Sequence, residues 1–405
     1  MSRIALLHYS APPIVGGVES VLGVHARLMA DAGHQVRIVA GRGEQTDPRV
    51  PFIHLPTADS RHPGVLAIKA ELDAGRVPSG FDKLTAALTA NLNETLDGVD
   101  VLIAHNVCSL SKNLALTAAV RNLANSSQPR IVLWHHDLAW TTPRYRSELH
   151  DGYPWDLLRQ AWPGVKQVTI SEMRQQELAE LFQIGREEIA VVPNGVDTAR
   201  FHKLEKQTHA YVQQLDLLNA CPLLLLPVRI TPRKNIELAL RVCASLTRHF
   251  PDTKLIVTGP LGPHNPANVE YFEKLTALRK ELGLGNVVCF LAELTSEYIP
   301  DEVIWDLYHL ADALFLPSRE EGFGIPLLEA GLAGLPIFCS DIPPLRSLGS
   351  SNVTYFSADA DPGELADTIA NELSSNAVFQ MRTEVRRGYT WERIYARQIA
   401  PLLSE

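Results

Sequence analysis

Short runs of consecutive apolar residues alternate along this chain with longer segments in which apolar residues recur every three or four positions. Continuous apolar runs are typical of strands in a parallel sheet with both faces covered, and the longer segments are typical of the helices that cover it. The first half of the chain predicts strands at residues 3–9, 35–41, 99–105, 130–136, 167–171 and 189–194. The same pattern restarts after residue 220 and predicts strands at residues 221–230, 254–260, 286–292, 311–318, 335–341 and 353–358.

This repeated pattern predicts an α/β protein with two Rossmann-like, doubly wound parallel-sheet domains. A Pro-Asn-Gly turn at residues 193–195 and a mixed polar stretch separate the two series of strands, so we expect domains at residues 1–199 and 200–389. Residues 390–405 are helical in pattern with no strand after them, and we expect them to join the first domain. Because ligands of open α/β sheets bind at the carboxyl ends of the strands, the loops there should carry the chemistry around one cleft.

Composition and charge exclude several classes of protein. The chain has 405 residues, of which 46% are hydrophobic and 20% charged, enough for two ordinary cores. A formal net charge of -9 argues against a nucleic-acid-binding protein. The five cysteines form no C-x-x-C pair, as is typical of reduced thiols in a cytoplasmic protein, and no Cys/His spacing predicts a metal site. No apolar run reaches the roughly 18 residues that cross a bilayer, so we expect no integral membrane association.

The most informative loop follows the predicted strand at residues 311–318 and reads REEGFG before a helix that begins IPLLEA. Gly322 and Gly324 allow the backbone a close approach, and the start of the helix offers unpaired N–H groups to an anion. Glu321 precedes the turn, and Glu329 lies in the second turn of the predicted helix. Two carboxylates flanking a phosphate site suit a ligand with hydroxyls on both sides of its phosphates, which is a nucleotide sugar.

This loop resembles that of the family 4 (group 1) retaining glycosyltransferases, which have the GT-B fold, and the resemblance covers nearly the whole chain. Glu321 and Glu329 match the family's E-x7-E motif, and its usual G-x-P follows at Gly334 and Pro336. The resemblance implies that Glu321 contacts the transferred sugar and Glu329 the ribose of the nucleotide. It also implies donor contacts from three loops, at Gly16, Gly17, Leu291, Gly322, Phe323, Gly324 and Ile325.

Two cations follow the predicted strand at residues 221–230. Arg229 at the strand end and Lys234 at the start of the next helix can converge on a diphosphate, the first as a planar donor fork and the second as a compact charge. The pair resembles the family's R-x4-K pair, which neutralises the leaving diphosphate. Val228 and Asn235 depart from the family pattern, because they stand where glycines usually flank the pair. The resemblance implies hexose transfer with a retained anomeric configuration and no required cofactor.

Polar and aromatic residues follow the third and fourth predicted strands. His136 resembles the position where the family places a histidine beside the donor sugar, and a buried structural histidine is the alternative. The aromatic-rich insert at residues 139–162 either stacks on sugars or anchors a long loop. On the acceptor side we expect His105, Asn106, Asp137, Trp140 and Tyr145, with a structural role as the alternative for His105 and Asn106.

The sequence thus predicts a glycosyltransferase that moves glucose or mannose from a UDP- or GDP-linked donor to a hydroxyl of a small soluble acceptor. The expected catalytic residues are Arg229, Lys234, Glu321 and His136. A sugar-nucleotide epimerase and a glycan phosphorylase of the same fold are the alternative enzymes. A nucleotide-sugar-binding sensor is the non-enzymatic alternative, and a homodimer is left open.

Overall fold

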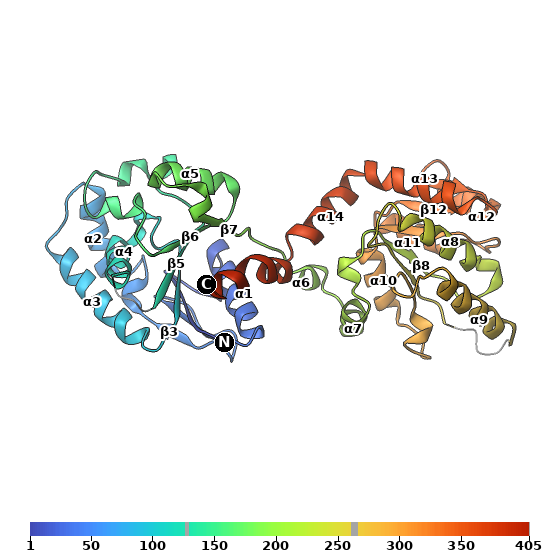
Figure 1. The fold of residues 1–405 in the computed structure, drawn as a ribbon, viewed down its shortest axis with the longest axis horizontal. Coiled ribbons are helices and arrows are strands. Elements are labelled where there is room, and N and C mark those ends of the chain that lie inside the picture. Colours follow the sequence, from blue (N-terminus) through green and yellow to red (C-terminus); the bar gives the residue numbers. More distant parts are fainter. Residues whose placement is uncertain (126–128, 261–265, 405) are drawn as a thin grey trace. The chain divides into compact units, whose positions relative to one another are not determined.

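The computed structural model describes residues 1–125, 129–260 and 266–404 and divides into two compact units. Unit 1 comprises Met1–Gly195 together with Trp391–Glu405, and unit 2 comprises Val196–Thr390. Each unit is built on one parallel β-sheet packed against helices (Figure 1). The predicted fold class, two doubly wound α/β domains, is therefore confirmed.

Seven strands form the sheet of unit 1, in the order β3-β2-β1-β4-β5-β6-β7. The order reverses between β1 and β4, and ligands of doubly wound sheets bind at such a point. One strand, β3, was not predicted, because it has only three residues and none of them is buried. The strands are β1 Arg3–His8, β2 Gln35–Ala40, β3 Phe52–His54, β4 Val101–His105, β5 Arg130–His135, β6 Lys166–Thr169 and β7 Ile189–Val191.

Helices bury both faces of this sheet. Ile4 and Leu6 of β1 join one core cluster, and the intervening Ala5 and Leu7 join another on the opposite face. Both faces are apolar, which is why these strands are continuous apolar runs in the sequence. The α-helices of unit 1 are α1 Gly17–Asp31, α2 Pro63–Asp73, α3 Gly80–Thr95, α4 Leu114–Leu123, α5 Glu172–Phe182, α15 Trp391–Ile394 and α16 Ala400–Ser404, with a π-helix at Tyr395–Ile399. Short 3₁₀ helices are η1 Pro56–Ala58, η2 Ser111–Asn113, η3 Pro143–Glu148, η4 Trp155–Leu158 and η5 Arg186–Glu188.

The last helices of the chain pack on unit 1 beside α1 (Figure 1). The Trp391 ring meets the His25 ring edge-on, with 5.3 Å between their centroids. A Cβ atom on Gly195 would lie 2.8 Å from Cδ2 of Trp391, so the chain leaves unit 1 directly beside the point of its return. The Arg130 guanidinium donates a hydrogen bond of 2.9 Å to the Leu402 carbonyl. These contacts make residues 391–404 part of the core of unit 1.

Six strands form the sheet of unit 2, in the order β10-β9-β8-β11-β12-β13. The order reverses between β8 and β11, so the loops after these two strands flank the expected ligand site. The strands are β8 Leu223–Leu226, β9 Lys254–Val257, β10 Val288–Phe290, β11 Ala313–Leu316, β12 Ile337–Ser340 and β13 Thr354–Phe356.

The segment between β8 and the next helix differs from its prediction. β8 ends at Leu226, so Arg229 lies in a loop, and Lys234 lies in the 3₁₀ helix η7 Pro232–Lys234. The helix α8 begins only at Ile236, because the preceding residue adopts a left-handed conformation. The helices of unit 2 are α6 Thr198–His202, α7 Lys206–Gln214, α8 Ile236–Leu246, α9 Pro266–Glu281, α10 Asp301–Leu310, α11 Ile325–Leu332, α12 Pro343–Gly349, α13 Pro362–Ser375 and α14 Ala377–Gly388, with 3₁₀ helices η6 Leu217–Asn219 and η8 Leu291–Glu293.

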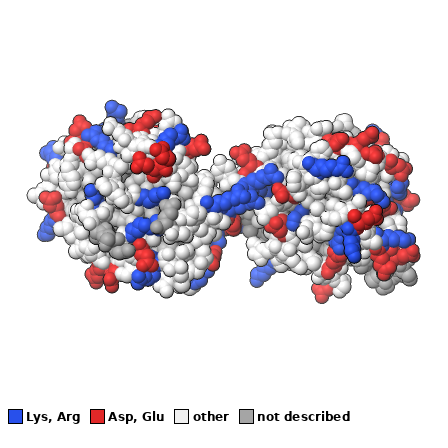
Figure 2. Space-filling model, viewed as in Figure 1, with Lys and Arg blue, Asp and Glu red and all other residues white. Residues whose placement is uncertain are grey.

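Acidic and basic side chains are interspersed over the face of each unit seen in Figure 2. Apolar side chains are exposed along α11, at Ile325, Leu328 and Leu332. Within the described ranges, no helix combines the length and the apolar character that a membrane span requires.

We predict that Trp391→Ala destabilises unit 1 and spares unit 2. Trp391 is 5% exposed, and truncating a buried aromatic side chain to alanine typically costs about 3–5 kcal/mol of unfolding free energy. Urea unfolding followed by hydrogen exchange would resolve the two units. The matched control is Tyr389→Ala, which truncates a nearby aromatic that is 39% exposed. Equal, small losses of unfolding free energy in Trp391→Ala and Tyr389→Ala would show that the C-terminal helices do not stabilise unit 1.

Candidate functional site

The loops after β8 and β11 bring together two residues that the sequence placed in separate motifs. Lys234 Nζ donates hydrogen bonds of 2.6 Å and 2.7 Å to the two carboxylate oxygens of Glu321. The Ser318 hydroxyl donates a third, of 2.7 Å, to Glu321 Oε1. The side chains of Lys234 and Glu321 are only 9% and 8% exposed. A buried ion pair with these additional bonds therefore joins the two loops at the switch point of unit 2.

Arg229 lies in the same loop as Lys234 but differs from it in its surroundings. It is exposed, and its guanidinium has no hydrogen-bond or ion-pair partner among the residues that the structure describes. Its backbone is held closely, because a Cβ atom on Gly259 would collide with the Val228 carbonyl oxygen and come within 2.5 Å of the Arg229 Cα. Its backbone is thus held in place while the donors of its guanidinium remain available to bind an anionic ligand.

Asn235 explains one departure from the family pattern. Its φ of 53° lies in the left-handed region, which glycine adopts freely and asparagine tolerates better than most residues. The Asn235 amide also donates a hydrogen bond of 2.9 Å to the Ala358 carbonyl. Asparagine thus supplies the backbone conformation that places Lys234 immediately before α8.

The glycine-rich turn before α11 has the geometry expected of a phosphate-binding loop. Gly324 has a φ of 107°, and a Cβ atom there would lie 2.6 Å from Leu345 Cδ2, so only glycine fits. Gly322 has open space around its Cα, and Phe323 and Ile325 are exposed beside it. Pro326 has no N–H and the Leu327 N–H donates a 3.0 Å hydrogen bond to the Gly324 carbonyl, so an anion at this end of α11 would bind the N–H of the exposed Ile325.

Glu329 and Leu291 have contrasting positions. Glu329 Oε2 accepts a hydrogen bond of 2.7 Å from the Tyr308 hydroxyl. Burial and this hydrogen bond raise the pKa of Tyr308, which keeps it a neutral donor. The Leu291 side chain is buried in the core at the start of η8, so any ligand contact there uses the backbone. Sequence reasoning missed Tyr308 and Ser318, because a single hydroxyl in an apolar segment gives no pattern.

Five buried histidines gather in unit 1, four of them at the carboxyl ends of its strands and one, His25, on α1. His105 Nδ1 lies 3.2 Å from His136 Nε2, and His8 Nδ1 lies 2.7 Å from the His105 carbonyl oxygen. Burial lowers the pKa of His8 and His135 to about 4 and that of His25 and His136 to about 3. His136 is therefore a neutral hydrogen-bonding group near pH 7. No three His, Cys, Asp or Glu side chains within the described ranges are arranged to hold a metal ion.

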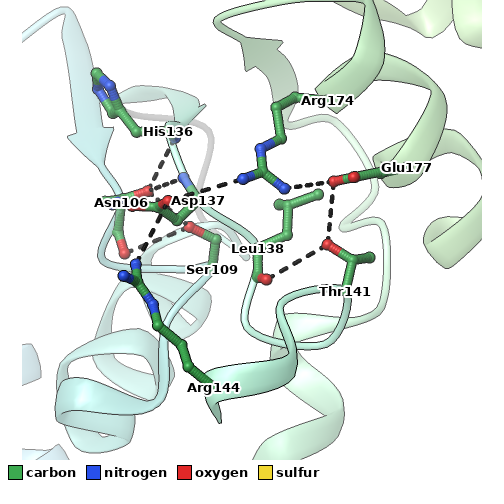
Figure 3. Close-up of polar contacts among 9 residues, drawn as sticks. All are labelled: Asn106, Ser109, His136, Asp137, Leu138, Thr141, Arg144, Arg174 and Glu177. Carbon is green, nitrogen blue, oxygen red and sulfur yellow. Dashed lines mark hydrogen bonds and ion pairs between the residues drawn. The ribbon is translucent and has the colours of Figure 1, made fainter. Parts of the chain in front are cut away.

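Asn106 fixes the loop after β5 (Figure 3). Its Oδ1 accepts hydrogen bonds from the backbone N–H groups of His136 and Asp137, at 2.9 Å and 3.0 Å, and from the Ser109 hydroxyl at 3.1 Å. Its Nδ2 donates to Asp137 Oδ2 at 3.4 Å. Asn106 is buried and has a φ of 61°. Its side chain therefore positions His136 and Asp137 within unit 1.

Two arginines that the sequence did not single out point toward Asp137 (Figure 3). Arg144 of η3 and Arg174 of α5 lie 3.8 Å and 3.9 Å from Asp137 Oδ1, beyond ordinary hydrogen-bond distance. Arg174 instead donates a hydrogen bond of 2.6 Å to Glu177. The helices that carry them, η3 and α5, follow the neighbouring strands β5 and β6. This order along the sequence was the signal that could have placed both arginines at the same edge of the sheet.

The first loop of unit 1 is organised by Glu19. The Ser10 hydroxyl donates a hydrogen bond of 2.6 Å to Glu19 Oε1. Burial opposes ionisation of Glu19, but this hydrogen bond and nearby positive groups keep its pKa below the usual value. A Cβ atom on Gly16 would collide with the Glu19 carboxylate, whereas Gly17 has open space around it. A side chain at Gly16 would therefore displace the Glu19 carboxylate, and Gly17 leaves the start of α1 accessible.

The aromatic insert is partly anchored. Trp140 donates a 3.4 Å hydrogen bond to the Trp155 carbonyl, and the Arg159 guanidinium lies 4.3 Å from its ring centroid. The Tyr145 ring lies under the Arg144 guanidinium, at 4.7 Å. Both rings are half-buried against the core. One face of each ring is therefore already covered by an arginine.

Two protein-family models match this chain: glycosyl transferases group 1 matches residues 211–387, and glycosyltransferase family 4 matches residues 15–200. Mannosylglucosylglycerate synthase of Thermotoga maritima is 27% identical over 375 residues, covering 84% of this chain and 83% of the relative. Glycogen synthase of Mycobacterium tuberculosis is 26% identical over 399 residues, covering 95% of this chain and 89% of the relative. The solved structure of Anabaena Alr3699/HepE in complex with UDP and glucose is 18% identical, with 100% of both chains covered and a TM-score of 0.38.

We predict that Lys234→Met lowers the unfolding free energy of unit 2 by about 3–5 kcal/mol, because it leaves the Glu321 carboxylate buried without a cation. The double variant Lys234→Met/Glu321→Gln should lose less, since it removes both charges. Urea unfolding measures each loss. Lys274→Met is the control, because it breaks an exposed pair with Glu270 and should change nothing measurable. A double variant with a lower unfolding free energy than Lys234→Met would contradict the prediction.

We also predict that unit 1 loses stability as the pH falls from about 6.5 to about 4. The folded pKa is about 4 for His8 and about 3 for His25, whereas the unfolded rings bind protons below about 6.5. The unfolded state therefore binds more protons than the folded state between these pH values. The free energy of unfolding is highest above about pH 6.5 and falls as the pH is lowered toward about 4. His25→Leu should reduce the dependence of stability on pH, because it removes one of the titrating rings. Leucine breaks no hydrogen bond there, since neither ring nitrogen of His25 has a partner among the described residues. Urea midpoints across this range measure the slope, and an unchanged slope would count against the assignment.

Proposed function

Because this chain belongs to the family 4 (group 1) glycosyltransferases and has their GT-B fold, we propose that it transfers glucose or mannose from a UDP- or GDP-linked donor to a hydroxyl of a small soluble acceptor. We propose that the anomeric configuration is retained. The donor would bind to unit 2 and the acceptor to unit 1. The observation that carries this proposal is the buried Lys234–Glu321 pair at the switch point of unit 2, with Arg229 in the same loop and without a partner among the residues that the structure describes.

The donor fits the groups around that pair. Arg229 and the Lys234 ammonium would bind the diphosphate, and the Ile325 N–H at the start of α11 would bind one of its remaining oxygens. Glu321 would accept hydrogen bonds from hydroxyls of the hexose. Glu329, held by the Tyr308 hydroxyl at 2.7 Å, would accept them from the ribose. Each proposed role requires the charge or hydrogen-bond capacity that the side chain has in the structure.

The reaction breaks the bond between the anomeric carbon and the diphosphate and forms a bond from the same face to the acceptor oxygen. Negative charge develops on the leaving diphosphate, where Arg229, Lys234 and the α11 N-terminus would stabilise it without a metal ion. We propose that a diphosphate oxygen takes the proton of the acceptor hydroxyl. Neutral His136 would hydrogen-bond the hexose, since a cation there would oppose the developing positive charge at the anomeric carbon.

The acceptor side rests on unit 1. Asp137 would accept a hydrogen bond from an acceptor hydroxyl, in the orientation that Asn106 gives it. His105, Trp140 and Tyr145 would shape the surrounding surface. The name of the Thermotoga relative supports a small acceptor, whereas the name of the Mycobacterium relative describes a polymer. We prefer the small acceptor, in keeping with the name of the Thermotoga relative.

The test is calorimetric titration with UDP, GDP and ADP and with their hexose derivatives. One diphosphate should bind, and Arg229→Ala should weaken it at least about tenfold, the usual effect of losing a charge-assisted hydrogen bond. Arg233→Ala is the matched control, because its exposed side chain is four residues away and should leave binding unchanged. Binding of no nucleotide by the wild type would refute the proposal.

Product analysis separates the alternatives. The anomeric proton signal of the product should match the configuration of the donor, and Glu321→Gln should lose turnover while nucleoside diphosphate still binds. Formation of an altered donor without an acceptor product would identify an epimerase. Binding without any turnover across acceptors would identify a sensor.

A further inference from the structure

We propose that His105 is a positioning residue that fixes the proton of His136 on Nδ1, so that His136 presents an N–H donor to a hydroxyl oxygen of the hexose. The proton positions follow from unit 1 alone, whereas their effect on the hexose rests on the proposed function. The proposal deepens that function, because it states which hydrogen-bonding role His136 has and which buried residue imposes that role.

The two histidines share one hydrogen bond. His105 ends β4, His136 directly follows the neighbouring strand β5, and His105 Nδ1 lies 3.2 Å from His136 Nε2. Both rings are neutral near pH 7, because burial lowers the pKa of each. A neutral imidazole carries one ring proton, so one of the two rings donates this bond and the other accepts it. The position of the proton on His105 therefore decides its position on His136.

His105 has no second partner for its proton. It is fully buried, and its Nε2 has no hydrogen-bond partner among the residues that the structure describes. Its ring stacks on Trp134 with the two ring planes 27° apart, so an N–H in the plane of the imidazole would not point at the face of the indole. A proton on Nε2 would thus leave an N–H without an acceptor in the core, and such groups are rarer in proteins than unpaired acceptors. The proton of His105 therefore belongs on Nδ1, which donates it to His136.

His135 shows the same arrangement in the same layer of the fold. Its Nε2 lies 2.8 Å from the Gln167 side-chain oxygen, which can only accept, while the Gln167 amide nitrogen donates to the Val165 carbonyl. His135 must carry its proton on Nε2, and the nitrogen that stays buried without a partner is the unprotonated Nδ1. His25 differs, because both of its nitrogens lack a partner, but its ring meets Trp391 at 88°, an arrangement in which an N–H can face an aromatic ring.

The remaining nitrogen of His136 is the one that can meet a ligand. His136 is 6% exposed, and its ring points away from Asn106 and Asp137 in Figure 3. Its Nδ1 has no hydrogen-bond partner among the described residues. Because Nε2 accepts the bond from His105, the proton of His136 lies on Nδ1. Asn106 also holds the backbone N–H of His136, at 2.9 Å, so both the main chain and the ring are oriented.

The proton positions can be read from the full-length protein by NMR. With isotope-labelled histidine, a long-range proton–nitrogen spectrum at pH 7 distinguishes protonated from unprotonated ring nitrogens, and His136→Gln assigns the signals of His136. In the wild type, the proton should lie on Nδ1 in both rings, with a coupling across the hydrogen bond from His105 Nδ1 to His136 Nε2. A proton on Nε2 of His136 would overturn the proposal.

Steady-state kinetics tests the effect on the hexose. His105→Leu removes the donor, so kcat should fall about tenfold, the usual effect of losing one hydrogen bond, while the Kd of the nucleoside diphosphate stays unchanged. His105→Asn should restore most of the activity, because the asparagine amide can donate from near the position of Nδ1. His25→Leu is the matched control. It removes a neighbouring buried ring, 5.3 Å away between centroids, that forms no hydrogen bond with a described residue, and it should leave kcat unchanged.

The outcomes separate this proposal from the proposed function. If no nucleotide binds while both protons lie on Nδ1, the proposed function fails and the assignment of the two rings stands. An unchanged kcat in folded His105→Leu, or equal losses in His105→Leu and His105→Asn, would overturn the role of His105 in the reaction. The wild-type spectrum needs no variant at His105, so it decides the proton positions even if His105→Leu does not fold.

Discussion

The buried ion pair of Lys234 and Glu321 is the constraint on which the candidate donor site depends. Two charges with side chains less than a tenth exposed are tolerated only because each satisfies the other and Ser318 adds a hydrogen bond. The pair fixes the loop after β8 against the loop after β11. The pair leaves one N–H donor of Lys234 available, because an ammonium has three donors and two of them bind Glu321. The pair therefore orders the site and leaves one donor for an incoming anion.

Unit 1 handles its polar groups in the opposite way. Burial keeps the five histidines His8, His25, His105, His135 and His136 neutral, and the Asn106 amide binds two backbone N–H groups and one carboxylate. Two carboxylates, Asp137 and Glu19, lie beside these groups at the strand ends. The strand ends of unit 1 thus combine neutral histidines with carboxylates, whereas the two buried charges at the switch point of unit 2 neutralise each other.

The sequence predicted most of the sheet, because strands buried on both faces are continuous apolar runs. It missed β3, which is short and not buried, and it extended β8 to Arg229 because apolar residues continue past Leu226 into a loop. The motif spacing predicted that Lys234 and Glu321 lie on neighbouring loops. It did not predict their ion pair, which depends on the side-chain conformations of two residues 87 positions apart in the sequence. Tyr308, Ser318 and Arg144 are ordinary residues in the sequence and gain their positions only from folding.

The close approach of Gly195 and Trp391 bears on the architecture of the chain. Val196 donates a 2.7 Å hydrogen bond to the Tyr389 carbonyl and forms an isolated bridge with Thr390, so the outgoing and returning segments run side by side. In topological terms unit 2 is an insertion: its first and last residues are neighbours, and the flanking residues of unit 1 are also in contact. One exchange at that junction would replace the whole of unit 2 and leave the hydrophobic core of unit 1 intact.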